Sequence, residues 1–303
     1  MNDASIPKQG SSDYRTGILY ALVGTLLFSI KPVLIKLAYS VGGDATSIMS
    51  LRAASSLPLY IAILLWLCWD PDKRSKLKKY GLQAALVGVL GYYCASLLDI
   101  LALDFISAQL ERLLIFMFPS FVVFISWGIL KEAPRKGTLT SIALGYVGVA
   151  MIVMHDFSSF GHQVWLGSAM AIASALIFAI YLVLSKKFIS KMGAQLFTSV
   201  GMGSAGIVIM AQYQLQGAQF TEMPNELIWM GVMIGVFCTV LPSYFVAAAM
   251  ARLTPSVLSL TSNIGPAVTA LFAILLLDES FTHWHGMGMI LVVYAVVRIN
   301  KKN

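Results

Sequence analysis

The two halves of the sequence repeat one another, and this repeat constrains the fold more than any other feature. Three residues recur 150 positions later, with Gly17, Phe28 and Lys36 corresponding to Gly167, Phe178 and Lys186. Two more recur 147 positions later, with Pro119 and Glu132 corresponding to Pro266 and Glu279. Each half contains five long apolar segments, and an odd number places the second copy in the opposite membrane orientation. Inverted repeats of this kind are typical of secondary transporters.

The composition is that of a membrane protein. Charged residues make up 12% of the chain and apolar residues 58%, whereas soluble domains have about 25% and about 45–50%. A bilayer core of ~30 Å needs about 20 apolar residues per helix. Ten segments meet this need, approximately at 17–39, 45–67, 81–103, 108–130, 137–154, 165–185, 194–213, 227–250, 255–277 and 282–299. The sequence therefore predicts an all-α integral membrane fold of ten transmembrane helices in two inverted five-helix repeats.

These spans leave little of the chain outside the membrane. We expect an N-terminal tail at 1–16, a first repeat at 17–154, an external linker at 155–164, a second repeat at 165–299 and a C-terminal tail at 300–303. No connecting segment is long enough for a soluble domain that hydrolyses nucleotides.

The positive charges indicate the orientation. If the N-terminus is cytoplasmic, every Lys and Arg outside the spans lies on the cytoplasmic face, because the opposite loops (40–44, 104–107, 155–164, 214–226 and 278–281) contain none. The positive-inside rule then predicts that both termini are cytoplasmic. The net charge of +7 is thus a topology signal that also suits contact with anionic membrane lipids, and we expect no nucleic-acid partner.

Two stretches resemble a known family. The first is Ser107-Ala-Gln-Leu-Glu-Arg-Leu-Leu-Ile-Phe-Met-Phe-Pro119, followed by Leu130-Lys-Glu132. The second runs from Thr254-Pro-Ser through Asn263-Ile-Gly-Pro266 to Leu277-Asp-Glu279. Both resemble the EamA family of the drug/metabolite transporter superfamily, over essentially all of residues 17–299. The resemblance implies transport of small metabolites, often amino acids or their derivatives and usually outward, driven by protons or exchange. It also implies a cavity between spans 1, 3, 4, 6, 8 and 9.

Ionisable residues inside or at the edge of the spans are the first candidates for a site. All of them belong to the first repeat: Lys31, Lys36, Arg52, Asp99, Asp104, Glu111 and Arg112. Because a charge at the bilayer centre costs at least ~2.5–3.5 kcal/mol on insertion scales, each should face a wet cavity or a partner. Whether Lys36 and Arg52 line a cavity stays open.

Neutral polar residues extend this pattern. Tyr92, Ser96 and Asp99 share one face of the third span, and Thr239, Ser243 and Val246 stand at the equivalent places in the eighth. In the ninth span, Ser256, Ser259 and Asn263 share a face. The first repeat thus supplies charge and the second supplies neutral hydrogen-bonding groups.

We expect a cavity that binds a small polar or zwitterionic metabolite. The predicted substrate-binding residues are Lys31, Tyr92, Ser96, Asp99, Glu111, Arg112, Ser243, Ser259 and Asn263. Arg112 or Lys31 would attract a carboxylate, and Glu111 or Asp99 would attract an amine or carry a coupling proton. The alternative is that Lys31, Asp99, Glu111 and Arg112 pair among themselves and only hold the helices together.

Proline and glycine give further signals. Pro119 and Pro266 are expected to kink the fourth and ninth spans at matched places, either at the site or as ordinary kinks. The GxGxxG pattern at 201–206 lies inside an apolar span, so it indicates close helix packing and no dinucleotide cofactor. Gly231 and Gly235 form a similar packing face, with a homodimer as the alternative. Asp278 and Glu279 are expected to satisfy backbone donors of the following helix.

No nucleophile–base or metal-ligand constellation occurs inside the spans, so we expect no enzyme activity, cofactor or metal site. The sequence therefore predicts a secondary transporter in a bacterial cytoplasmic membrane, first as an exporter of an amino acid or derivative. The alternative is an importer of a nutrient such as a riboflavin-like vitamin or a nucleoside-like compound. A sensor or a membrane enzyme is a remote alternative.

Overall fold

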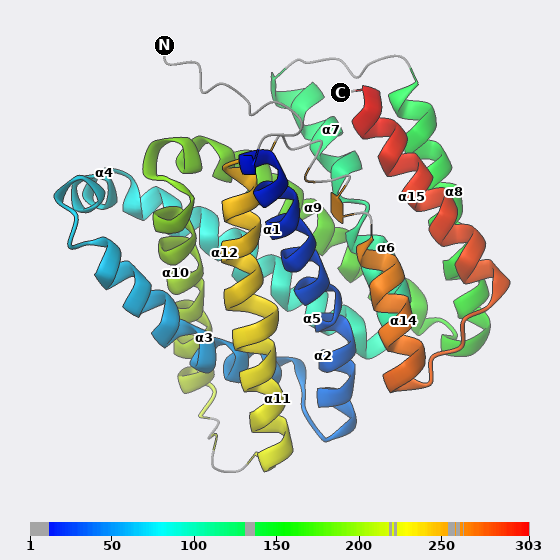
Figure 1. The fold of residues 1–303 in the computed structure, drawn as a ribbon. Helices are drawn as coiled ribbons and strands as arrows, with labels where there is room; N and C mark the ends of the chain where they lie inside the picture. Colours follow the sequence, from blue (N-terminus) through cyan, green and yellow to red (C-terminus); the bar gives the residue numbers. More distant parts are fainter. Residues whose placement is uncertain are drawn as a thin grey trace.

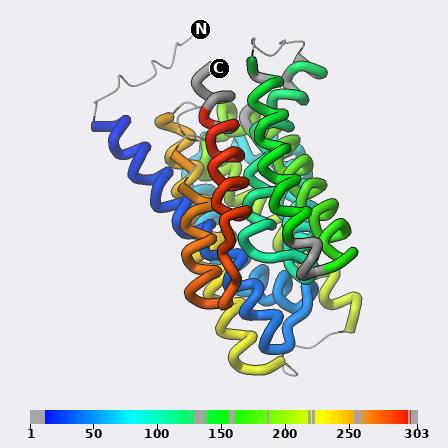
Figure 2. The backbone as a smooth tube through the Cα atoms, turned by 90° about the vertical axis from the view of Figure 1, so that its right-hand side faces the viewer, coloured from blue at the N-terminus to red at the C-terminus, as the bar shows by residue number. Residues whose placement is uncertain are grey.

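The computed structural model describes residues 12–130, 137–217, 220, 223–253, 258, 261–262 and 264–302. These residues form a bundle of helices with no β-strand among them, and α1 begins at the end of the bundle where α15 finishes (Figure 1; Figure 2). The first half contains α1 (Ser12–Ser29), α2 (Lys31–Ser40), α3 (Ala45–Leu67), α4 (Pro71–Gly88), the π-helical turn η1 (Val89–Cys94), α5 (Ala95–Phe105), α6 (Ala108–Ile115), α7 (Phe118–Leu130) and α8 (Thr138–Phe160). The second half contains α9 (Gln163–Met192), α10 (Ala194–Leu215), α11 (Asn225–Gly235), the π-helical turn η3 (Val236–Val240), α12 (Leu241–Met250), α14 (Gly265–Leu277) and α15 (His283–Lys302).

The helices follow the predicted spans. Seven stretches of the described residues are long and apolar enough to cross a membrane: Ser12–Ser40, Ala45–Leu67, Pro71–Phe105, Ala108–Ile125, Gln163–Met192, Ala194–Leu215 and Asn225–Met250. Two shorter apolar helices, Leu139–His155 and Gly265–Leu277, lie in the predicted fifth and ninth spans. Since α15 covers the tenth, the all-α membrane fold expected from the sequence is confirmed.

The fourth and ninth spans contain helix starts at matched prolines. In the fourth, α6 ends at Ile115, and Pro119 is the second residue of α7. In the ninth, α14 begins at Gly265, and Pro266 follows it. Proline is tolerated in a first helical turn because the N–H that it lacks would have no partner there.

Equivalent helices of the two halves make equivalent contacts. α1 packs against α12, and their counterparts α9 and α5 pack against each other. In the same way, α11 packs on α3 and α4 packs on α10. The last helices of the two halves, α8 and α15, lie side by side (Figure 1). The interface between the halves is therefore pseudo-symmetric.

The repeated glycines mark two equivalent contacts of this interface. A Cβ atom at Gly17 would lie 2.9 Å from Leu253, and one at Gly167 would lie 2.7 Å from Ile106. Leu253 and Ile106 are themselves 147 positions apart. A side chain at either glycine would force helices of opposite halves apart, which explains why both halves carry glycine here.

The other small-residue motifs also pack within the chain. A Cβ atom at Gly88 of α4 would lie 2.2 Å from the Cα atom of Gly201 on α10. Gly231 and Gly235 lie against α3, where added Cβ atoms would meet side chains of that helix. The prediction that these motifs serve close helix packing is confirmed.

Candidate functional site

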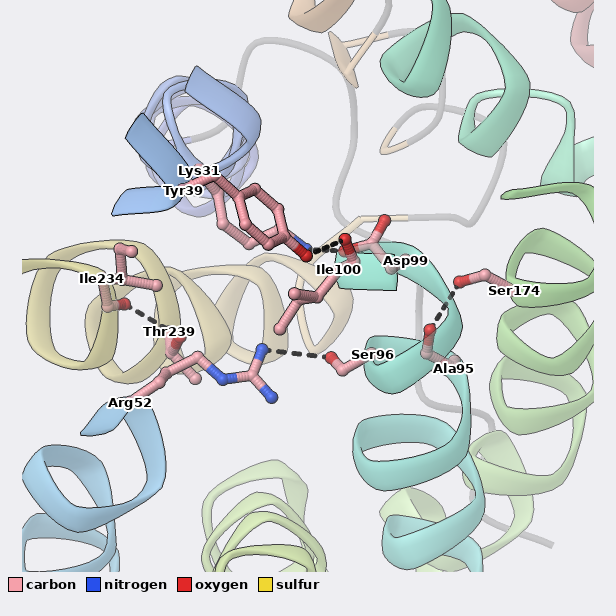
Figure 3. Close-up of polar contacts among 10 residues, drawn as sticks. All are labelled: Lys31, Tyr39, Arg52, Ala95, Ser96, Asp99, Ile100, Ser174, Ile234 and Thr239. Atoms are coloured by element: carbon pink, nitrogen blue, oxygen red, sulfur yellow. Dashed lines mark hydrogen bonds and ion pairs between the residues drawn. The ribbon is translucent and has the colours of Figure 1, made fainter. Parts of the chain in front are cut away.

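Lys31 is positioned by a break in the first span. α1 ends at Ser29, and α2 begins at Lys31 with Pro32 in its first turn. The Lys31 Nζ atom lies 2.5 Å from the Oδ2 atom of Asp99 on α5 (Figure 3). Asp99 is only 4% exposed. Since an unpaired charge there would cost several kcal/mol, the ion pair is what allows this carboxylate to remain in the interior.

Glu111 of α6 lies beside this ion pair. Its carboxyl group lies close to that of Asp99, and the residue is 1% exposed. Within the described part of the chain, the Glu111 Oε2 atom has no hydrogen-bond partner. Two carboxyl groups buried this close together repel each other unless one of them carries a proton. The Asp99–Glu111 contact is therefore a place where a proton can be held.

The next residue, Arg112, connects α6 to α1 and α14. Its Nη2 atom donates to the Ser29 Oγ atom at 3.4 Å. A Cβ atom at Gly265 would lie 2.9 Å from the same nitrogen, so the glycine leaves room for the guanidinium. The buried Arg112 Nε atom and both amide atoms of Gln109 lack a hydrogen-bond partner among the residues described. Polar groups with unused capacity thus gather on α6.

The first turn of α6 is capped from the opposite half of the chain. The Ser107 Oγ atom accepts from the Leu110 N–H at 3.1 Å, and the Glu279 Oε1 atom accepts from the Ala108 N–H at 2.8 Å. The prediction that Glu279 accepts from backbone N–H groups of the helix following it was wrong, because its carboxylate accepts from a backbone N–H group of α6 instead. A carboxylate here also compensates the positive end of the helix dipole.

Arg52 of α3 forms a second polar group. Its Nη1 atom donates to the Ser96 Oγ atom at 3.1 Å (Figure 3). Ser96 and Asp99 are three residues apart on α5, so this helix contacts both Arg52 and Lys31. In Figure 3, Arg52 and Lys31 approach α5 from different elements.

A small cavity of about 20 Å³ lies beside Arg52, between α3, η1, α10 and η3. A space of this size holds about one water molecule. Its lining residues are Arg52, Ala53, Ser56, Tyr60, Tyr92, Met202, Ala205, Gly206, Ile209 and Thr239. The cavity therefore lies between spans 2, 3, 7 and 8, whereas the Lys31–Asp99–Glu111–Arg112 group lies on spans 1, 3 and 4.

Two π-helical turns form part of the cavity wall. Val89–Cys94 interrupts the third span and Val236–Val240 interrupts the eighth, and their first residues are 147 positions apart. They place Tyr92 and Thr239 at equivalent positions in the lining. The Thr239 Oγ1 atom donates to the Ile234 carbonyl at 2.9 Å (Figure 3). Single π-helical turns occur frequently at functional sites, so this matched pair supports a functional role for the cavity.

The remaining predicted site residues fall in several places. The Tyr92 hydroxyl accepts from Tyr181 at 3.3 Å, and the Ser243 Oγ atom lies 3.0 Å from the Tyr60 hydroxyl. Ser259 and Asn263 lie outside the described residues. Lys36 interacts electrostatically with Glu279 and Asp104, away from the cavity lining.

A larger hollow of about 290 Å³ lies between α3, α4 and α10. Its walls are mainly apolar, and they include Leu82 and Ile207, which are 77% and 56% exposed. Apolar side chains this exposed on a membrane protein face lipid, so this hollow suits acyl chains better than a polar metabolite.

The fold and these buried polar groups define a class of protein, a multi-pass membrane transporter in which two similar halves meet around ionisable side chains. The EamA-like transporter family matches residues 15–154 and again residues 165–301. The chain therefore belongs to this family.

Relatives with assigned names support the same class. The chain is 25% identical to the uncharacterised transporter YcbK of Bacillus subtilis, over 87% of this chain and 86% of that protein. It is 21% identical to the uncharacterised transporter sll1319 of Synechocystis, over 94% and 93%. It is 24% identical to the uncharacterised inner membrane transporter YicL of Salmonella typhimurium, over 74% and 75%. A protein of known crystal structure, 16% identical, aligns with a TM-score of 0.64 over 94% of this chain and 96% of that one, which shows a shared fold.

Proposed function

We propose that this transporter is a secondary active exporter of a small polar or zwitterionic metabolite, an amino acid or a derivative. We place it in a bacterial cytoplasmic membrane with both termini in the cytoplasm. The observation that carries the proposal is the buried group Lys31, Asp99, Glu111 and Arg112, with hydrogen-bonding capacity left over on Glu111 and Arg112. Groups that served only to hold helices together would be expected to satisfy one another fully.

We further propose that the metabolite moves by alternating access. The pseudo-symmetric contacts between the halves support this, because two similar bodies can rock around a shared centre. The polar groups lie where the halves meet: Gly265 of the second half contacts Arg112 of the first. The cavity of about 20 Å³ among the described residues is too small for a metabolite, so binding requires this space to widen.

The coupling proton would reside on the Asp99–Glu111 pair. Lys31 is ion-paired to Asp99, and the carboxyl group of Glu111 lies close to that of Asp99. A charged ligand or a movement of α2 that changes the Lys31–Asp99 contact would change how firmly the pair holds its proton. Proton uptake on one side of the membrane and release on the other can thereby be linked to movement of the metabolite.

The test compares metabolites inside and outside cells that produce the wild type, Glu111→Gln or Glu226→Gln. Glu226 is an exposed residue in the first turn of α11 and serves as the control. We expect one compound to accumulate in the medium with the wild type and the control, and to lose most of that accumulation with Glu111→Gln. Collapse of the proton gradient at fixed membrane potential should have the same effect as Glu111→Gln.

Other outcomes separate the alternatives. A compound depleted from the medium and enriched inside the cells would make the protein an importer. Accumulation that is equal in all three strains and insensitive to the proton gradient would contradict the role of Glu111. All variants should be checked for equal amounts of folded protein in the membrane.

A further inference from the structure

Arg52 is a buried cation that forms no ion pair among the described residues, although it interacts electrostatically with Asp99, whose ion-pair partner is Lys31. The Arg52 residue is 5% exposed. Among the described residues, its side chain makes one hydrogen bond, from Nη1 to the Ser96 Oγ atom at 3.1 Å. A guanidinium has five N–H donors, so most of its capacity is unused. Retaining such a charge inside a membrane is costly unless a ligand or water compensates it.

The small cavity lies beside Arg52. Arg52 lines this cavity, and it is the charged member of the lining. The hydroxyl groups of the lining each have a partner: Ser56 and Thr239 donate to backbone carbonyls, Tyr60 is bonded to Ser243, and Tyr92 accepts from Tyr181. Tyr92 keeps its own O–H as a donor, so the guanidinium is the charged donor of this wall and the Tyr92 hydroxyl is a neutral one.

The lining also indicates the chemistry of that partner. A planar guanidinium binds a carboxylate through two parallel hydrogen bonds. A dianion such as a phosphate monoester would require two cations. Among the lining residues, Arg52 is the one cation. The rest of the wall is mostly apolar or aromatic, with Ala53, Met202, Ala205 and Ile209 among its residues. This combination suits the carboxylate of a monoanion beside apolar atoms, and the cavity of about 20 Å³ would have to widen to take the rest of the molecule.

We propose that Arg52 binds the carboxylate of the transported metabolite, and that the substrates are small organic monocarboxylates, amino acids included. This inference rests on the proposed transport function and assigns its anion subsite to spans 2, 3, 7 and 8. The proton-holding pair and the anion subsite are then separate groups. They are linked through α5, because Ser96 contacts Arg52 while Asp99, one turn later, contacts Lys31.

The experiment measures ligand-induced stabilisation of the purified full-length protein in lipid nanodiscs. Four probes share one branched apolar body: leucine, 4-methylpentanoate, leucinamide and isopentylamine. Ligands that bind the folded state raise its thermal midpoint. We expect a rise with the two acids and none with the amide or the amine.

Arg52→Gln should bind the acids at least about tenfold more weakly, because a charge-assisted contact is lost. The affinity of Arg52→Lys for the acids should lie between those of the wild type and Arg52→Gln. Arg74 is exposed, so Arg74→Gln should bind the acids as the wild type does.

A second measurement covers the case in which Arg52→Gln does not fold. Phenylglyoxal modifies arginine side chains, and peptide mass spectrometry can locate the product. In the wild type, we expect 4-methylpentanoate but not isopentylamine to protect Arg52 from modification. Equal protection by acid and amine, or no stabilisation of the wild type by either acid, would overturn the proposal.

The outcomes also separate this inference from the transport function, because binding requires no gradient. Acid binding that depends on Arg52, in a protein that exports nothing, would leave the subsite standing and overturn the export function. If the protein exports a compound that has no carboxyl group, and Arg52→Gln does not change its ligand affinity, the export function stands and the anion subsite is overturned.

Discussion

At the scale of single residues, the described helices bring the cations Lys31, Arg52 and Arg112 into the interior together with the carboxyl groups of Asp99 and Glu111. Lys31 and Asp99 compensate each other directly at 2.5 Å. Removing one partner of a buried ion pair leaves an uncompensated charge, whereas removing both leaves none. The stability of single and double variants therefore shows how much of this pair is structural.

Lys31→Met should destabilise the protein by about 3–5 kcal/mol, because Asp99 then remains buried without its partner. The double variant Lys31→Met with Asp99→Asn should recover a large part of that loss. The measurement is thermal or denaturant unfolding of the purified variants in the same detergent. A single variant as stable as the wild type would show that other groups compensate Asp99.

The sequence predicted which residues are candidates for the site better than it predicted which residues contact one another. Charges inside apolar spans are visible in the sequence, and this identified Lys31, Asp99, Glu111 and Arg112 as one candidate group. Helical periodicity also placed Tyr92, Ser96 and Asp99 on one face, but it assumes about 3.6 residues per turn. The π-helical turn Val89–Cys94 adds a residue to that ladder. As a result, Tyr92 lines the small cavity whereas Asp99 pairs with Lys31.

At the scale of elements, the two π-helical turns had no clear sequence signal. They form where the third and eighth spans pack against the other half, and the residue before each turn is a glycine, Gly88 or Gly235. The glycine can be seen in the sequence, but the backbone shift that follows it depends on the tertiary contact. Arg52 was likewise left unassigned, because a span position gives depth in the membrane and does not give the neighbour across the interface.

The contact at Gly88 gives a prediction for these elements. Gly88→Ala places a Cβ atom 2.2 Å from the Cα atom of Gly201, so α4 and α10 must separate, at about 1–3 kcal/mol. Gly203→Ala is the control on α10, since its nearest neighbour would be the Tyr60 Cβ atom of α3 at 3.9 Å. We expect a lower thermal midpoint for Gly88→Ala and an unchanged or slightly higher one for Gly203→Ala. The same midpoint for both variants would argue against tight packing at Gly88.

At the scale of the whole molecule, contacts between the halves lie at both ends of the central polar groups. At one end, Glu279 of the second half caps α6 of the first. At the other end, α1 packs against α12, and the Arg252 Nε atom lies 2.9 Å from the Asp13 Oδ1 atom. Alternating access requires that contacts at one end open while those at the other remain closed. In the proposed orientation, with both termini in the cytoplasm, the α1–α12 end is the cytoplasmic one.

Holding the α1–α12 end closed should therefore stop transport. The variant carries Asp13→Cys and Arg252→Cys in a background where the three free cysteines, Cys68, Cys94 and Cys238, are replaced by serine. A short bismaleimide that joins residues 13 and 252 should abolish export of the metabolite found in the medium. Each single-cysteine variant treated with the same reagent should retain export, because its helices remain free to separate. If the cross-linked protein exports at the rate of the untreated one, the two helices do not separate during the cycle, and the cytoplasmic path must open between other elements.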